Sequence, residues 1–119
     1  MNLENVILEL KQFVKERDWS KFHSPKNLAM AIVSEAGELA ALYRFVKDDD
    51  SDSFSNINKP REKIANEIAD VGIFILLLCD RIGIDLIEAI KNKIKINRQN
   101  YPADKIRGQA ERPTNDKSF

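Results

Sequence analysis

The apolar residues of this chain recur at intervals of three and four, which is the period of a helix that buries one face. No stretch alternates polar and apolar side chains in the way that a half-buried strand does. Glycine and proline, which interrupt regular elements, number only four each. These features predict an all-α fold, and 119 residues suit one domain.

Capping residues divide the chain into helices. Ser24 is a suitable N-cap, and the proline that follows it fits a first helical turn. Gly83 is a suitable C-cap, and Asp85 begins a capping box with Glu88. We therefore expect four helices, over residues 3–17, 24–47, 60–82 and 85–100. A polar loop is expected over residues 47–53, and a helical domain over residues 1–102. A polar, extended or loose tail is expected over residues 103–119.

The third predicted helix carries a continuous apolar stretch from Val71 to Cys79. A helix that is apolar around its whole circumference is central in a protein or lies in an interface. A bundle of this size does not hide one helix completely by itself. We therefore expect self-association that buries the third helix, at least as a dimer.

Composition excludes several other roles. Lys plus Arg and Asp plus Glu both number 19, so the charge gives no reason to expect a nucleic acid polymer as partner. No apolar run approaches the about 18 residues of a membrane span, and the N-terminus does not resemble a signal peptide. A single cysteine favours a reducing compartment. We expect a cytoplasmic protein without a membrane partner.

Two acidic pairs stand where apolar side chains are expected. Glu35 lies within the apolar stripe of the second helix, and Glu38 lies at its edge. Glu67 and Asp70 share one face of the third helix, which continues as an apolar face. A buried carboxylate needs a partner or a shifted pKa, so acids at these positions require an explanation.

If the second and third helices pack together, the four carboxylates converge and repel one another. A divalent cation would compensate this repulsion, and a set of oxygen ligands favours Mg²⁺ or Mn²⁺. The alternative is that each pair belongs to an ordinary solvated helix face. The pattern alone leaves the metal site and the solvated face equally open.

The acidic pairs also resemble a known signature. Residues 35–38 (EAGE) and 67–70 (EIAD) resemble the ExxE and ExxD motifs of the all-α, MazG-like nucleoside triphosphate pyrophosphohydrolases. Residues 16–28 (ERDWSKFHSPKNL) and 96–102 (INRQNYP) resemble the branch that contains dCTP pyrophosphatase. The resemblance covers about residues 5–110, with its blocks in order.

This resemblance implies a MazG fold similar to a four-helix bundle, with residues 1–102 as the catalytic domain. It implies Mg²⁺-dependent hydrolysis of nucleoside triphosphates to monophosphate and pyrophosphate, with dCTP or a related pyrimidine preferred. The metal would be held by Glu35, Glu38, Glu67 and Asp70. Glu35 and Glu38 would be catalytic, one of them as general base.

The resemblance also implies a set of residues that bind the substrate. Trp19 would stack on the base, and basic and amide groups of the fourth helix would hold the triphosphate. The set comprises Trp19, His23, Phe45, Lys93, Asn97, Arg98 and Tyr101. For Trp19 a structural role is the alternative, and for the others it is an ordinary solvated or structural position.

The chain departs from the branch at three positions. Leu10 stands where dCTP-specific relatives have a histidine, and Phe45 stands where a second tryptophan is expected. Ser34 replaces a further glutamate of many relatives. Ser34 leaves fewer candidate metal ligands or general bases. The changes at Leu10 and Phe45 leave the choice of nucleobase open, so dUTP, purine or damaged triphosphates are alternative substrates. A non-catalytic helical interaction module is a third alternative, and the assembly is expected to be a homodimer or homotetramer.

Overall fold

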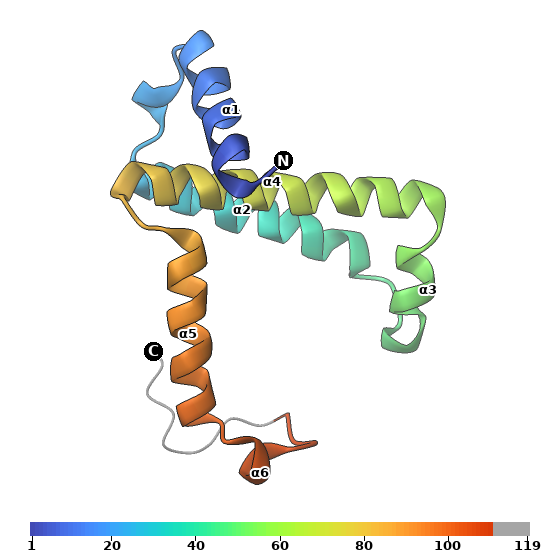
Figure 1. Ribbon diagram of the computed structural model, residues 1–119. Helices are drawn as coiled ribbons and strands as arrows, with labels where there is room; N and C mark the ends of the chain where they lie inside the picture. Colours follow the sequence, from blue (N-terminus) through green and yellow to red (C-terminus); the bar gives the residue numbers. More distant parts are fainter. Residues whose placement is uncertain (111–119) are drawn as a thin grey trace. The chain divides into compact units, whose positions relative to one another are not determined.

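The computed structural model describes residues 1–110, and every regular element in that part of the chain is helical (Figure 1). The chain divides into two compact units, Met1–Gly83 and Ile84–Phe119. The first unit contains α1 (Leu3–Glu16), η1 (Ser20–Phe22), α2 (Pro25–Tyr43), η2 (Asp48–Asp50), α3 (Ser51–Ser55) and α4 (Asn58–Ile82). The second contains α5 (Leu86–Asn100) and α6 (Ala103–Ile106). The predicted all-α class is confirmed.

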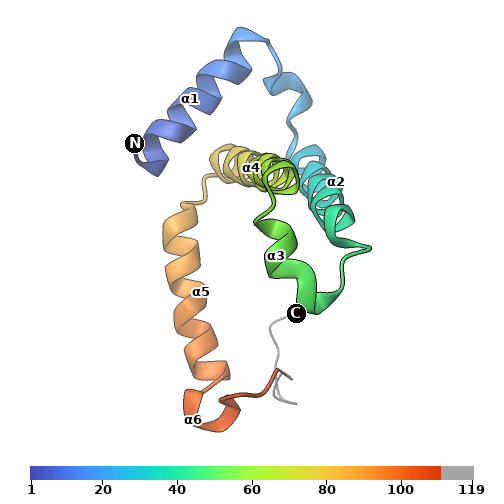
Figure 2. The same cartoon turned by 90° about the vertical axis from the view of Figure 1, so that its right-hand side faces the viewer.

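The first unit is built on the long helix α4. Helix α2 lies along α4 in two views at right angles, and the chain reverses between them through η2 and α3 (Figures 1 and 2). Helix α1 also packs on α4. The packing of the second predicted helix against the third, on which the metal hypothesis depends, is therefore confirmed.

The predicted caps are formed. The Asn27 amide donates to Ser24 Oγ at 3.2 Å, at the start of α2. The Glu88 amide donates to Asp85 Oδ1 at 3.0 Å, at the start of α5. Gly83 ends α4 with a φ of 75°, a left-handed conformation that favours glycine. These polar contacts fix where the long helices begin and end.

The segment between α2 and α4 differs from the prediction. Helix α2 ends at Tyr43 rather than near Lys47, and the polar segment forms η2 and α3 instead of a loop. Serine hydroxyls bond back to the backbone here, since Ser51 Oγ donates to the Asp48 carbonyl at 2.8 Å. Tyr43 Oη and Ser55 Oγ share a hydrogen bond of 2.6 Å that ties α3 to the end of α2.

In the second unit, the residues predicted as an extended or loose tail begin with a short helix, so that prediction is wrong for α6. The amides of Lys105 and Ile106 both donate to the Pro102 carbonyl, at 2.9 and 3.2 Å. Proline fixes its own φ and starts this turn without needing an amide proton. Residues 111–119 of the predicted tail lie outside the described residues.

The buried apolar core of the described chain is small and lies in the first unit. It consists of Val14 on α1, Leu28 on α2, and Ile64 and Leu76 on α4. Apart from Leu76, the apolar stretch at residues 71–79 is only half-buried within this single chain. Complete burial of this helix by self-association therefore stays a prediction. None of the described helices is long and apolar enough to cross a membrane.

Leu28→Ala is expected to lower the free energy of unfolding by about 2–5 kcal/mol, because Leu28 is 1% exposed and its loss leaves a cavity between packed helices. Urea unfolding followed by circular dichroism measures the change. Leu8→Ala is the matched control, since Leu8 is 63% exposed and its truncation should cost about 0.5 kcal/mol or less. Equal losses in the two variants would contradict this assignment of the core.

Candidate metal and nucleotide site

Three of the four predicted metal ligands meet where α2 packs on α4. Glu35 of α2 and Glu67 and Asp70 of α4 each offer one carboxylate oxygen, and these oxygens all lie within 4.8 Å of one another. The spacing of three residues places Glu67 and Asp70 on the same face of α4. The hydrophobic contact between the two helices thus forces negative charges together.

Glu38 lies one turn after Glu35 on α2, but it is exposed and is not part of this close group. Its charge nevertheless contributes to the raised pKa of Glu67, so it belongs to the same electrostatic environment. Its roles as a ligand or general base stay predictions.

Glu67 is the most constrained of these acids. Its pKa is raised above the ordinary value, first by a hydrogen bond with the Glu35 carboxyl, then by burial, and then by the nearby negative charges. That hydrogen bond requires a proton on one of the two carboxyls, because ionised carboxylates only accept. Glu67 Oε2 is buried and has no hydrogen-bond partner among the described residues.

A cation is the other way to satisfy this buried oxygen. The three side chains offer only carboxylate oxygens, which are the ligands that hard cations such as Mg²⁺ and Mn²⁺ prefer. The donor set and the unpaired Oε2 atom both fit a divalent cation at this position.

A cavity of about 530 Å³ lies beside the carboxylates, between α1, the segment that follows it, and α4. Its walls are mainly apolar, and three of its residues carry ionisable side chains: Glu9, His23 and Asp70. The apolar walls are formed by Val6, Leu10, Phe13, Val14, Trp19, Ile73, Phe74 and Leu77. Asp70 therefore belongs both to the carboxylate group and to the cavity.

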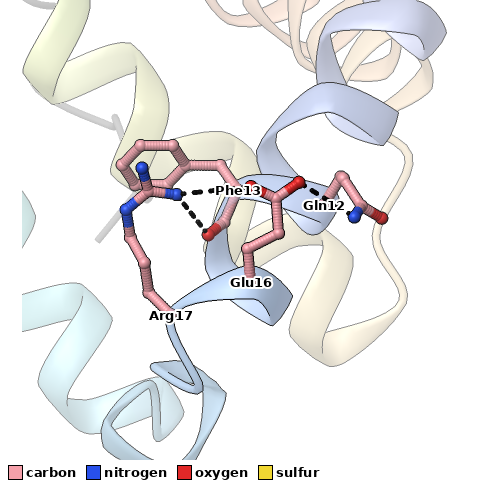
Figure 3. Close-up of polar contacts among 4 residues, drawn as sticks. All are labelled: Gln12, Phe13, Glu16 and Arg17. Carbon is pink, nitrogen blue, oxygen red and sulfur yellow. Dashed lines mark hydrogen bonds and ion pairs between the residues drawn. The ribbon is translucent and has the colours of Figure 1, made fainter.

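The aromatic wall of this cavity is held by local contacts at the end of α1. The rings of Phe13 and Trp19 meet edge to face, with centroids 5.8 Å apart. The Arg17 guanidinium lies over the Phe13 ring at 3.7 Å and donates to the Phe13 carbonyl at 3.1 Å (Figure 3). A flat, apolar wall of this kind suits the face of a nucleobase.

The structure brings only two of the predicted substrate-binding residues, Trp19 and His23, to this cavity. Phe45 does not line it; it is 89% exposed, with the Arg44 guanidinium 5.0 Å from its ring. The remaining predicted residues belong to the second unit, and their roles stay predictions. Lys93, Asn97 and Arg98 lie on α5, and Tyr101 is its C-cap.

Of the eight lining residues that were not predicted as site residues, only Glu9 is charged and only Phe13 and Phe74 are aromatic. In the sequence Glu9 has the signal of an ordinary surface acid, although it precedes Phe13 by four residues and so lies one turn before it on the same side of α1. This spacing predicts Glu9 as a cavity residue only if the apolar stripe of α1 is interpreted as the wall of a pocket.

The fold and the site define an all-α protein with a carboxylate centre suited to a divalent cation and with an adjoining apolar cavity. The chain belongs to the MazG-like family, whose sequence profile matches residues 31–114. Both acidic pairs lie inside this match, whereas Trp19 and His23 precede it.

Relatives of known structure and name support this membership. A pyrophosphatase from Archaeoglobus fulgidus superimposes with a TM-score of 0.77 at 37% identity, over 84% of this chain and 92% of that one. dCTP pyrophosphatase 1 from Mus musculus is 38% identical over 108 residues, which make up 91% of this chain and 64% of the relative. The human protein of that name is 36% identical over 112 residues, or 94% and 66% of the two chains. The chain thus spans about two thirds of these curated relatives.

Glu67→Gln is expected to stabilise the metal-free protein near neutral pH. Folding raises this pKa, so the folded chain holds the proton more tightly. The stability that the protonated Glu67 carboxyl contributes is present at a pH below its pKa in the unfolded chain, and it is lost as the pH rises through its pKa in the folded chain. An amide removes the repulsion, and it should also remove the rise in melting temperature that Mg²⁺ gives the wild type.

Glu62→Gln is the matched control, because Glu62 is an exposed acid on the same helix. Thermal unfolding of the three proteins with Mg²⁺ and with a chelator makes the comparison. A Mg²⁺-dependent rise that survives in Glu67→Gln would show that the ion binds elsewhere.

Proposed function

We propose that this chain is a metal-dependent nucleotide pyrophosphohydrolase that converts nucleoside triphosphates to monophosphate and pyrophosphate. The proposal is carried by Asp70, which joins the carboxylate group to a cavity walled by Trp19. An acid shared in this way would let one ligand place its phosphates at a cation and its base in the cavity. Family membership and the names of the relatives support the same chemistry.

Glu35, Glu67 and Asp70 would hold the cation, with Glu38 as a further ligand or as a base. Mg²⁺ is the proposed ion, and Mn²⁺ would substitute. When bound, the cation neutralises phosphate charge and makes the attacking water more acidic. The reaction adds water across the anhydride bond between the α- and β-phosphates, and one carboxylate takes the released proton.

Glu38 is the better placed of the two proposed catalytic glutamates to accept that proton. It is exposed, whereas Glu35 is half-buried against Glu67 and Asp70. A base must reach a water molecule, and a carboxylate already engaged with a cation is a weaker base. Glu35 is then a ligand that also fixes the position of the cation.

For the base, we propose a pyrimidine, with dCTP preferred. Trp19 offers a face for stacking, and the named relatives include dCTP pyrophosphatases. Leu10 lies in the cavity wall and offers no hydrogen bond there, which keeps dUTP, purine and damaged triphosphates as alternative substrates. Lys93, Asn97, Arg98 and Tyr101 are proposed triphosphate ligands on the resemblance alone.

The alternative that is not an enzyme is a helical interaction module without catalytic activity. It would have no need for Glu67, whose buried oxygen lacks a partner among the described residues and so costs free energy. Retention of all four motif acids favours the enzyme.

Loss of a residue that only orients a metal ligand lowers activity by about 10- to 100-fold. Asp70→Asn and Glu38→Gln should each lower kcat by more than this. Asp70→Asn removes a ligand charge, and Glu38→Gln removes a proton acceptor. The measurement is pyrophosphate release from each dNTP with Mg²⁺, with circular dichroism to confirm that both variants keep their helices. Glu62→Gln is the control, and it should retain full activity.

Release of phosphate instead of pyrophosphate would show that a different bond is cleaved. Full activity in both variants would contradict the assignment of the carboxylates. If the wild type releases no pyrophosphate from any triphosphate, the proposed function fails.

We also propose that the protein is a homodimer or homotetramer. The apolar stretch of α4 stays half-buried within one chain, and apolar side chains such as Met30, Val33 and Ile68 are more than half exposed. Light scattering at micromolar concentration is expected to give a mass at least twice the 13.6 kDa of one chain. A mass of one chain at every concentration would contradict this proposal.

A further inference from the structure

The cavity contains an acid that the carboxylate centre does not use. Of its three ionisable residues, Asp70 belongs to the group at the α2–α4 contact. His23 can donate or accept a hydrogen bond, depending on which ring nitrogen carries the proton, so it does not select a base by itself. Glu9 is the remaining one, and an ionised carboxylate only accepts hydrogen bonds.

Glu9 is available for a ligand. Its side chain makes no hydrogen bond or ion pair with any residue in the described part of the chain, and it is exposed. Glu16, farther along α1, differs: Gln12 Nε2 donates to it at 2.9 Å and Arg17 Nη1 lies 3.8 Å from it (Figure 3). Glu16 is therefore committed to contacts within α1, while the acid at the cavity is not.

We infer that Glu9 determines base specificity by accepting a hydrogen bond from an exocyclic amino group, so that the cavity favours aminopyrimidines over oxopyrimidines. The inference rests on the proposed function for the identity of the ligand as a nucleotide. It adds to that function a residue that selects the base, and it states which pyrimidine that residue favours. Glu9 would act at the base, apart from the carboxylates that act at the phosphates.

The chemistry of the two pyrimidines gives the direction of selection. Cytosine carries a 4-amino group that donates, and acidic side chains recognise cytosine by accepting from this group. Uracil carries a 4-oxo group that accepts, so a carboxylate beside it gains no hydrogen bond and adds repulsion between two acceptors. The walls around Glu9 are mainly apolar and provide stacking. Besides Asp70 of the carboxylate group, Glu9 is the lining side chain that can only accept a hydrogen bond, and only an acceptor favours the 4-amino over the 4-oxo group.

The test is an equilibrium titration with the α,β-methylene analogues of dCTP and dUTP, which cannot be cleaved at the α–β position. Trp19 is the only tryptophan of the chain and lines the cavity, so its fluorescence reports occupancy directly. The proteins are the wild type, Glu9→Gln, and Glu4→Gln as control. Glu4 is an exposed acid on the same helix that does not line the cavity.

The wild type and Glu4→Gln are expected to bind the cytosine analogue about tenfold or more tightly than the uracil analogue, as one hydrogen bond to a charged group provides. In Glu9→Gln the preference should fall to nearly one, because an amide can donate to the 4-oxo group as well as accept from the 4-amino group. An unchanged preference in Glu9→Gln, or no preference in the wild type, would overturn the inference.

Failure of the proposed function would look different. If the wild type discriminates between the analogues through Glu9 but releases no pyrophosphate from dCTP, Glu9 recognises the base and the hydrolytic assignment is wrong. If pyrophosphate is released but the analogues bind equally, hydrolysis stands and Glu9 has no part in selection.

Discussion

The Glu67 carboxylate is held where α2 packs on α4, with Oε2 buried and unpaired among the described residues, and the rest of the site depends on how its charge is compensated. Burial of Leu28 and Ile64 holds these helices together, and the same contact confines Glu35 and Asp70 within 4.8 Å of Glu67. Carboxylates brought so close are unfavourable without a proton or a cation. Burial of the apolar side chains therefore holds together a group of like charges that is itself unfavourable. A conflict of this kind, between stable packing and local charge repulsion, is typical of functional sites.

Helix α4 also determines how the carboxylate group and the cavity are arranged relative to each other. Asp70, Ile73, Phe74 and Leu77 follow one another at helical spacing, so one face runs from the carboxylate group along the apolar cavity. Helix α1 lies over that face, and the Phe13–Trp19 contact forms the aromatic wall. A nucleotide has the same polarity, with charged phosphates at one end and a flat base at the other. This match between ligand and helix face is the physical basis of the proposed function.

The sequence predicted the elements whose signals are periodic. The apolar stripes and the caps at Ser24, Gly83 and Asp85 were sufficient for the long helices, and the two acidic pairs predicted that α2 and α4 would bring carboxylates together. Short helix α3 was not predicted, since it depends on serine hydroxyls bonding to nearby carbonyls rather than on an apolar stripe. Glu9 was missed because its place at the cavity depends on how α1 lies on α4, a tertiary relation that periodicity does not encode.

Anomalous diffraction from crystals grown with Mn²⁺ and the α,β-methylene analogue of dCTP tests the central claim most directly, since it locates the ion and the base in one experiment. The account predicts an Mn²⁺ peak at about 2 Å from carboxylate oxygens of Glu35, Glu67 and Asp70, with the base in the cavity against Trp19. An ion bound away from these three residues, or a base bound outside the cavity, would contradict it.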